Sequence, residues 1–206
     1  MSAYTIPQVI TRDGRGERAM DVYSQLLHER IIYLGTGIDS GVANAVIAQL
    51  LHLESADPDT PVNLYINCEG GDPSATLAIY DTMQYIRAPV ATTCVGQAFA
   101  AGAVLLAGGE AGARAMLPHT RIVLHQPAIG AGRGAIPDLI LHADELVRVR
   151  GELEEVLARH TGRDVEQLRR DTDRDRVFTA AQALDYGLVD EVLSTRSTAA
   201  ARPLAA

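Results

Sequence analysis

The sequence has little cysteine, no long apolar run and no excess of basic residues, and each of these shortages excludes a class of protein. Its two cysteines, Cys68 and Cys94, form no C-x-x-C motif and no paired framework, which suits a reducing compartment. The apolar stretches are all too short to span a bilayer. No basic segment followed by an apolar one opens the chain, so no secretory signal is indicated. We therefore expect a soluble cytoplasmic protein without membrane attachment.

Charge and length exclude further classes of protein and of binding partner. The 18 Lys and Arg residues are outnumbered by 26 Asp and Glu residues, which gives a formal net charge of −8. So acidic a chain is a poor ligand for nucleic acid or for an anionic membrane, since both are themselves negatively charged. With 47% apolar residues among 206, the chain can bury one sizeable core. We therefore expect a single domain that binds neither nucleic acid nor an anionic membrane.

Short apolar strands alternate with helical patterns along most of the chain. The predicted strands are Arg30–Leu34, Val62–Asn67, Ala91–Val95 and Arg121–His125. The predicted helices run from Glu17 to Glu29, from Asp39 or Ser40 to about Leu53, from Pro73 to Ile86 and from Pro137 to about His160. Asp39 and Ser40 can both act as N-caps of the second helix, whose apolar stripe is Val42, Val46, Leu50 and Leu53. Strands that alternate with helices indicate βαβ units. The predicted fold is therefore a layered α/β domain with parallel strands.

The ends of the chain and its longest helix need separate interpretation. Residues 1–16 lack periodicity and are predicted to form an extended arm, and residues 194–206 carry no core pattern and are predicted to be a disordered tail. The helix from Pro137 has an apolar stripe that can face either the core or another subunit. This stripe consists of Leu139, Leu146, Val149, Leu153 and Val156.

The stretch from Thr92 to Gly109, TTCVGQAFAAGAVLLAGG, joins a β-rich run to an apolar helix through small residues. Small residues allow a tight turn and close packing of the helix. A turn of this kind can present a nucleophile at the edge of a sheet. Between Cys94 and Gly112, however, there is no Ser, Thr or Cys. The pattern alone therefore fits a close-packed buried helix start as well as a catalytic turn.

The segment GQAFAAGAVLLAGG, from Gly96 to Gly109, resembles the nucleophile segment of the proteolytic subunit of the ATP-dependent Clp protease, a GQAAS-type motif followed by small residues. The resemblance covers nearly the whole chain, from RGERAMDVYSQLLHERIIYLG at its beginning to AQALDYGLVDEVL near its end. It implies the ClpP/crotonase fold, with repeated ββα units and a protruding handle helix at about residues 128–160. It also implies that residues 1–16 line an axial pore and that residues 17–193 form one domain.

The resemblance implies a serine-peptidase site and assigns its parts to particular residues. The family's catalytic serine falls on Ala100, its catalytic histidine on His125 in LPHTRIVLHQP, and its orienting aspartate on Asp175 in DTDRDRVFTA. The oxyanion hole is implied to consist of the backbone N–H groups of Gly71 and Ala101. Such donors survive a change of side chain. We expect neither a metal nor another cofactor.

The resemblance also implies partners. In the family the handle helix joins two seven-membered rings, and Arg174 falls where an arginine makes ring-to-ring contacts. A hexameric AAA+ unfoldase docks into apolar pockets between neighbouring subunits. Docking residues carried over to this chain are Tyr65, Tyr85, Val95 and Leu193. Asn63 and Thr93 fall where larger apolar residues are commoner, so we expect weaker docking, at about 25 cal/mol per Å² of lost burial.

Ala100 is the main departure from the family pattern, because its methyl group cannot attack a carbonyl. Cys68, Glu69, Phe99 and Ala101 also depart from the commonest pattern at the same site. One explanation is an active endopeptidase that carries an engineered Ser→Ala substitution. The other is a naturally inactive paralogue that assembles with an active one into mixed rings. A single engineered change would not bring the other departures, so we favour the second explanation.

Three further alternatives stay open. A crotonase-like acyl-thioester enzyme also uses paired backbone N–H groups and needs no serine, although the handle and the DTDRDR segment favour the Clp type. A purely homomeric inactive barrel would be a binding or sequestering particle. Cys68 could act as a thiolate nucleophile beside a histidine. It precedes the oxyanion turn, however, and the adjacent Glu69 would raise rather than lower the pKa of its thiol.

Overall fold

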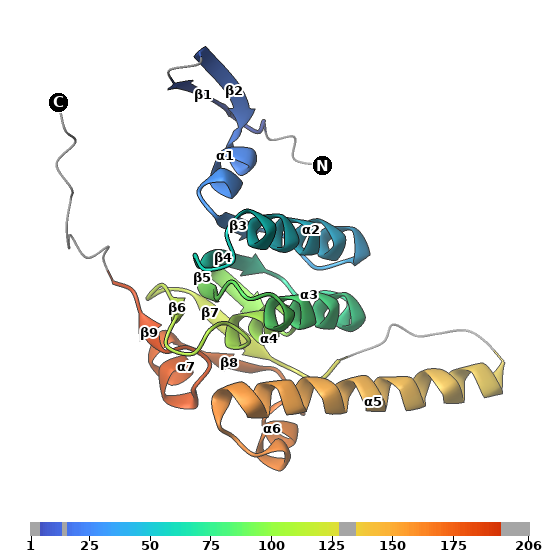
Figure 1. The fold of residues 1–206 in the computed structure, drawn as a ribbon. Helices are drawn as coiled ribbons and strands as arrows, with labels where there is room; N and C mark the ends of the chain where they lie inside the picture. The colour runs from blue at the N-terminus through green and yellow to red at the C-terminus, as the bar shows by residue number, and fades with distance from the viewer. Residues whose placement is uncertain (1–4, 14–15, 128–134, 195–206) are drawn as a thin grey trace.

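The computed structural model describes residues 5–13, 16–127 and 135–194 (Figure 1). In chain order the elements are β1 Gln8–Asp13, β2 Gly16–Asp21, α1 Val22–His28, β3 Ile31–Leu34, α2 Ser40–Ala56, β4 Val62–Cys68, α3 Pro73–Tyr85, β5 Val90–Phe99, α4 Ala101–Ala107, β6 Arg114–Met116, β7 Arg121–Leu124, α5 Ile136–Thr161, α6 Val165–Asp171, β8 Arg176–Phe178, α7 Ala180–Tyr186 and β9 Glu191–Val192. The glycine-rich start of the predicted handle, residues 128–134, and nearly all of the predicted tail lie outside the described residues.

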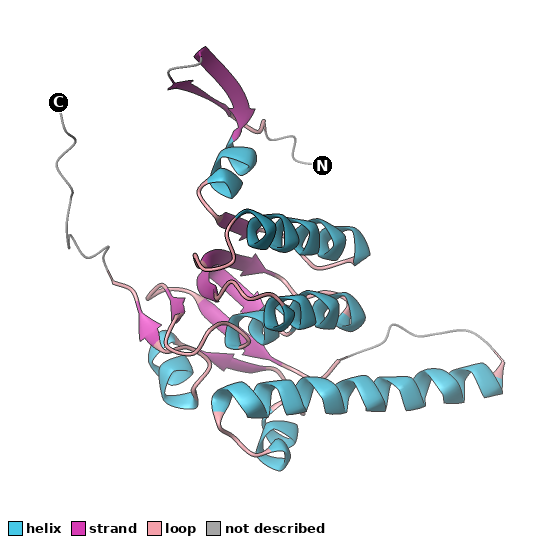
Figure 2. Ribbon diagram, in the orientation of Figure 1, coloured by secondary structure: helices cyan, strands magenta, loops and turns pink. Residues whose placement is uncertain are grey.

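A mostly parallel sheet forms the centre of the domain. Its strands follow the order β3-β4-β5-β6-β9, and β7 pairs with β5 on one side and with β8 on the other. Every pairing in this sheet is parallel except that of β7 with β8. Parallel neighbours need crossover connections, and here helices supply several of them. The layered α/β fold with a parallel sheet is therefore confirmed (Figure 2).

The core lies between the sheet and the helices that cover it. Helix α2 buries one stripe of apolar residues, and every residue of the short helix α4 is buried. Removing this apolar surface from water is the main favourable contribution to folding. The buried stripe of α2 consists of Ala43, Val46, Leu50 and Leu53. Three of these four residues belong to the stripe that the sequence pattern predicted.

Several helix starts follow from local chemistry. The side chain of Asp39 accepts a hydrogen bond from the Val42 N–H and caps α2, as the sequence indicated. Asp72 caps α3 in the same way, with Pro73 in the first helical turn, where proline loses no intrahelical hydrogen bond. These caps satisfy N–H groups that the helix itself leaves without partners.

The prediction of a helix from Glu17 was wrong for its first five residues. Residues up to Asp21 form β2, which pairs with β1 in an antiparallel hairpin. The carboxylate of Asp21 accepts hydrogen bonds from the Tyr23 N–H and the Ser24 N–H, and so starts the helix at Val22. Pairing with β1 thus overrides the weak helical pattern. The hairpin stands apart from the sheet in Figure 1.

The third predicted strand is longer than expected. β5 runs on past Val95 to Phe99, because its second half pairs with β7 from Gln97 onwards while its first half pairs with β6. Gly96 lies within this strand, and a Cβ there would come within 2.3 Å of the Asn67 side chain. The glycine therefore permits close approach to the neighbouring strand and does not end β5. Sequence periodicity did not reveal β6, β8, β9, α6 or α7.

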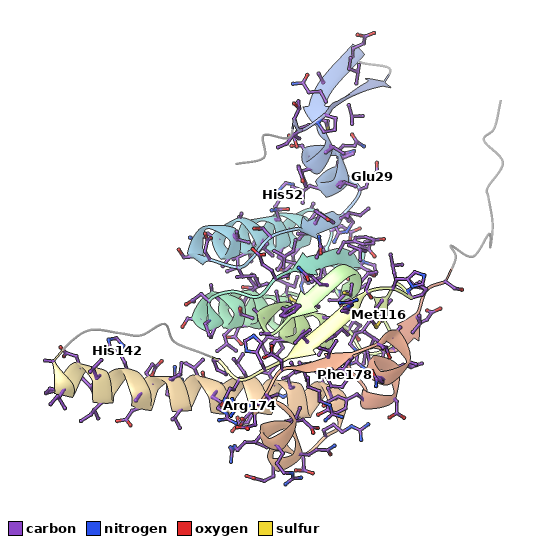
Figure 3. All side chains as sticks on the ribbon, turned by 180° about the vertical axis from the view of Figure 1, so that it is seen from behind. Glu29, His52, Met116, His142, Arg174 and Phe178 are labelled. Carbon is purple, nitrogen blue, oxygen red and sulfur yellow. The ribbon has the colours of Figure 1, made fainter. Side chains whose placement is uncertain are left out.

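Helix α5 matches the predicted handle closely and projects beyond the sheet (Figure 1). Its C-terminal half buries Val149 and Val156 against the domain, so this part of the predicted stripe belongs to the core. His142 lies on the projecting half (Figure 3). That half exposes Leu139, which belongs to the predicted stripe, and other large apolar side chains that do not. The exposed set is Ile136, Leu139, Ile140, Leu141 and Val147.

Among the residues described, no helix has the length and apolar character needed to cross a bilayer.

Candidate active site

The turn between β5 and α4 holds Ala100 in a costly backbone conformation. Ala100 has φ 36° and ψ −93°, and a residue with a Cβ adopts a positive φ only where the surrounding structure imposes it. The Ala100 N–H donates to the carbonyl of Val123 in β7 at 2.8 Å, and its carbonyl accepts from the Val104 N–H at 3.0 Å. A sharp strand-to-helix turn of this kind is the geometry that exposes a nucleophile in hydrolases.

Two backbone N–H groups near this turn can serve as hydrogen-bond donors to a ligand. Ala101 is the first residue of α4, where the helix supplies no acceptor for its N–H. Gly71 forms a parallel bridge with Ile38, in which Ile38 exchanges hydrogen bonds with the neighbours Gly70 and Asp72. Because N–H directions alternate along extended chain, the N–H of Gly71 points away from Ile38.

Gly71 cannot be replaced without moving the backbone around it. Its φ is +152°, and a Cβ at this position would lie 2.2 Å from the carbonyl oxygen of Ile38. Real Cβ atoms do not approach backbone atoms so closely. The glycine therefore permits the close contact that places its N–H at the site.

One cavity of about 290 Å³ brings the predicted parts together. Ala100, Ala101, Gly71 and His125 all line it, although they come from widely separated parts of the sequence. The parallel sheet explains this, since the turns that follow β4, β5 and β7 meet at one edge. The cavity also has apolar walls, to which Val104, Leu124, Leu153 and Leu157 contribute.

His125 is half-buried at the end of β7. Its Nδ1 lies 2.7 Å from the carbonyl oxygen of Gln126. A carbonyl oxygen only accepts hydrogen bonds, so Nδ1 carries the proton of this contact and donates it. In the neutral ring Nε2 is then left as an acceptor, which is the form that a general base requires.

Asp175 and Arg174 lie on the loop between α6 and β8, and both are exposed. Asp175 is not among the residues that line the cavity, and no hydrogen bond joins it to His125 in the described parts of the chain. The side chain of Arg174 is 93% exposed and its Nε lies 3.8 Å from a carboxylate oxygen of Asp173. In Figure 3 Arg174 is drawn on the same side of the domain as α5. Ala100 and His125 thus line one cavity. The antiparallel pairing of Leu124 with Arg176 brings the backbone of Asp175 beside that of His125, but the Asp175 side chain is exposed.

The two unusual residues of the oxyanion turn occupy different environments. Cys68 is fully buried, and its Sγ lies 3.3 Å from the carbonyl oxygen of Gly70 and 3.4 Å from the Gly70 nitrogen. Burial raises the pKa of its thiol, with a further contribution from the charge of Glu69. A buried thiol that stays protonated is a poor nucleophile, which argues against Cys68 as a replacement for serine. Glu69 is exposed and lines the cavity, which adds negative charge close to the oxyanion donors.

The residues carried over for unfoldase docking lie on different elements of the domain. Val95 and Leu193 line a second, shallow cavity of about 300 Å³ together with Leu117. Tyr65 is half-buried on β4 and lies opposite Thr93 of β5. Tyr85, at the C-terminal end of α3, is 82% exposed. The structure therefore places only two of the four in one hollow.

Sequence reasoning missed three polar residues of the cavity wall, Gln126, Arg150 and Glu154. Glu154 is only 3% exposed although it carries a charge. Its carboxylate accepts hydrogen bonds from Arg150 at 2.7 Å and from Arg169 at 3.0 Å and 3.2 Å. On the helical pattern it follows Arg150 by four residues, a spacing that indicates a surface ion pair. Nothing in that spacing shows that the pair turns inward.

The parallel sheet with a long projecting helix carries a strand-to-helix turn that meets a histidine and two backbone donors, an arrangement typical of hydrolases that present a nucleophile on such a turn. Comparison with known proteins agrees, since the model of the Clp protease family matches residues 14–196. The chain belongs to this family.

Three relatives show how close the match is. The chain is 71% identical over 197 residues to the ATP-dependent Clp protease proteolytic subunit 1 of Nocardia farcinica, covering 95% of this chain and 100% of the relative. It is 57% identical to proteolytic subunit 2 of Streptomyces avermitilis, over 95% of this chain and 98% of the relative. It is 56% identical to proteolytic subunit 4 of Rhodococcus jostii, over 94% of this chain and 100% of the relative.

Proposed function

We propose that this chain is a Clp-type proteolytic subunit without peptidase activity of its own, which joins an active paralogue in a two-ring barrel as a structural or regulatory subunit. The observation that carries the proposal is Ala100, which occupies the nucleophile turn at the cavity but offers no atom to attack a carbonyl. In subtilisin, removal of the triad serine lowers kcat about a millionfold. Oxyanion donors and binding alone do not replace it.

The rest of the site supports a serine-peptidase site that lacks only the serine hydroxyl at position 100. The turn keeps a positive φ at Ala100, although this conformation is energetically unfavourable for alanine. His125 remains at the cavity, and Gly71 keeps a backbone that no other residue can adopt there. An engineered Ser→Ala form of an active endopeptidase would share these features, and codon 100 of the native gene distinguishes the two. The family match gives no support to an acyl-thioester enzyme.

The handle helix supports assembly. Its projecting half exposes Ile136, Ile140, Leu141 and Val147 at 56–74%. Large apolar side chains gathered on one element are typical of protein–protein contacts. The proposal assigns this surface to ring-to-ring contacts, together with Arg174. It assigns residues 1–16 to the axial pore and residues 17–193 to the single domain.

An AAA+ unfoldase is the other partner that we propose, with weak docking at the residues that the family resemblance assigns to it, Tyr65, Tyr85, Val95 and Leu193. The small or polar side chains of Asn63 and Thr93 reduce the apolar area that such a partner can bury. Both cysteines of the described chain are free and buried, and a cytoplasmic location fits this state. Unfoldase binding as tight as that of an active paralogue would contradict the docking part of the proposal.

The experiment that tests the proposal compares the purified chain with its Ala100→Ser variant, each assembled alone and with an active Clp-type paralogue. Hydrolysis of a short fluorogenic peptide is measured for each assembly. In assemblies without the paralogue, we expect the Ala100→Ser variant to cleave the peptide and the unaltered chain not to cleave it. Cleavage by the unaltered chain, once a contaminating protease is excluded, would overturn the proposal. Failure to form particles with the paralogue would overturn its assembly part.

A further inference from the structure

The turn after β4 places a carboxylate at the rim of the cavity. Glu69 is exposed and lines the cavity, two residues before Gly71, whose N–H can donate to a ligand. Its side chain lies over Gly37 in the loop between β3 and α2, since a Cβ added to Gly37 would come within 3.4 Å of Cγ and of Oε1 of Glu69. The carboxylate is therefore adjacent to the site and stays in contact with water.

The arginine and the other glutamate of the cavity wall already neutralise each other. Arg150 donates to Glu154 at 2.7 Å, and Glu154 also pairs with Arg169 of α6 at 3.0 Å. Glu69, in contrast, belongs to none of the ion pairs within the described parts of the chain. Asp72, the exposed cap of α3, adds a second negative charge close by. The rim of the cavity therefore carries a negative charge that no described ion pair balances.

Ala100 changes the effect of this charge. In a peptidase, attack on the carbonyl creates a negative oxygen that the backbone donors stabilise, and a carboxylate nearby opposes it by repulsion. No such oxygen forms where Ala100 takes the place of the nucleophile. A peptide that is bound without being attacked does not suffer this repulsion, and any positive charge that it carries is attracted to Glu69. The residues at 69 and 100 are thus compatible in a site that binds without cleaving.

We propose that the cavity binds a peptide segment in which a lysine or arginine stands beside an apolar residue, and that Glu69 selects the positive charge. The apolar side chain enters between Val104, Leu124 and Leu157, where its burial supplies affinity. The cationic side chain stays at the rim, partly hydrated, against Glu69. The formal net charge of −8 favours the approach of such a segment as well. This inference rests on the proposed function, because it names the ligand of the same site in a subunit that does not cleave.

The test measures peptide binding by the unaltered chain in its assembled form. The probes are pairs of peptides with blocked ends and a neutral fluorescent label, in which lysine or norleucine stands before, or after, a central leucine. Norleucine keeps the apolar stem of lysine and removes its charge. Fluorescence anisotropy gives Kd for the unaltered chain, for Glu69→Gln and for Glu110→Gln. Glu110 is exposed too but does not line the cavity, so its variant controls for the change in net charge.

We expect the lysine peptide of at least one pair to bind the unaltered chain about threefold more tightly than its norleucine counterpart, an effect of the size that an exposed ion pair gives. Glu110→Gln should keep this ratio. Glu69→Gln should abolish it while it changes the Kd of the norleucine peptide less than the Kd of the lysine peptide. Because salt screens exposed charges, the ratio should also fall between about 50 mM and about 500 mM NaCl.

Equal Kd values for lysine and norleucine in both pairs, or no binding of any peptide to the unaltered chain, would overturn the inference. A ratio that Glu69→Gln leaves unchanged would do so as well. If the unaltered chain cleaves the peptides, the proposed loss of activity fails, and the ratio of kcat/KM for lysine and norleucine peptides then decides the selectivity in place of Kd.

Discussion

The backbone N–H of Ala100 donates to the carbonyl of Val123 at 2.8 Å, so β7 fixes the turn at the end of β5. This single hydrogen bond ties the nucleophile position to the strand that leads into His125 two residues later. A serine at position 100 would stand on the same backbone, because the conformation comes from the strand pairing and not from the side chain.

The strain at Ala100 gives the first prediction. With φ 36°, Ala100→Gly should leave the free energy of unfolding unchanged or raise it by up to about 1 kcal/mol, because glycine adopts positive φ without steric cost. Ala103→Gly, two residues into the same buried helix, should lower it by about 1 kcal/mol or more. Urea unfolding of both variants measures the difference. Equal destabilisation by the two substitutions would show that Ala100 is not strained.

The oxyanion turn gives the second prediction. Gly71→Ala should destabilise the protein by more than about 3 kcal/mol or prevent folding, since the new Cβ would meet Ile38 backbone atoms at 2.2–2.7 Å. Gly112→Ala is the matched control, because Gly112 also has positive φ (+84°) but nothing within 4 Å of the added Cβ. It should cost only about 1 kcal/mol. Thermal and urea unfolding compare them, and similar losses would contradict a clash at Gly71.

The third prediction concerns pH. Burial, followed by the charges of Arg114 and Arg159, lowers the pKa of His160 below its usual value near 6.5, and its Nε2 lies 2.9 Å from the Tyr80 hydroxyl. The unfolded chain therefore binds a proton more readily than the folded one. The stability that neutral His160 contributes is present above pH 6.5 and is lost as pH falls through the lowered folded pKa.

Urea unfolding at pH 7.5, 6.5 and 5.5 measures this effect. His160→Gln, which keeps a hydrogen-bonding group for Tyr80, should flatten the loss of stability below pH 6.5. His52→Gln, on the exposed side of α2, should leave the slope unchanged. If both variants keep the slope of the unaltered chain, His160 is not its source.

The projecting half of α5 gives the fourth prediction. Ile140 is 56% exposed and shares a helical stripe with Ile136 and Val147. Ile140→Glu should reduce the particle mass measured by light scattering, because a buried unpaired carboxylate opposes the apolar contact that we propose between rings. His142→Glu adds a charge on the other side of the helix, since residues two apart do not face each other. It should have a smaller effect, and an unchanged mass with Ile140→Glu would exclude this stripe as the contact.

Elements whose pattern is local and strong could be predicted from the order of the amino acids. The apolar strand cores, the Asp39 cap and the long handle helix were all predicted within a few residues. The motifs around Ala100 and His125 also indicated the family that the comparisons then showed. These features are encoded by neighbours along the chain, and backbone dihedrals and side-chain alternation depend on such neighbours.

The remaining features depend on contacts between segments that are distant along the chain. β2 replaced the start of a predicted helix because β1 pairs with it, and β5 passed through Gly96 because β7 lies alongside. The inward ion pair of Arg150 and Glu154, and the meeting of Gly71, Ala100 and His125 at one cavity, arise where segments distant in sequence pack together. Hydrogen bonds and burial between such segments carry free energies that exceed local preference, and no local pattern records them.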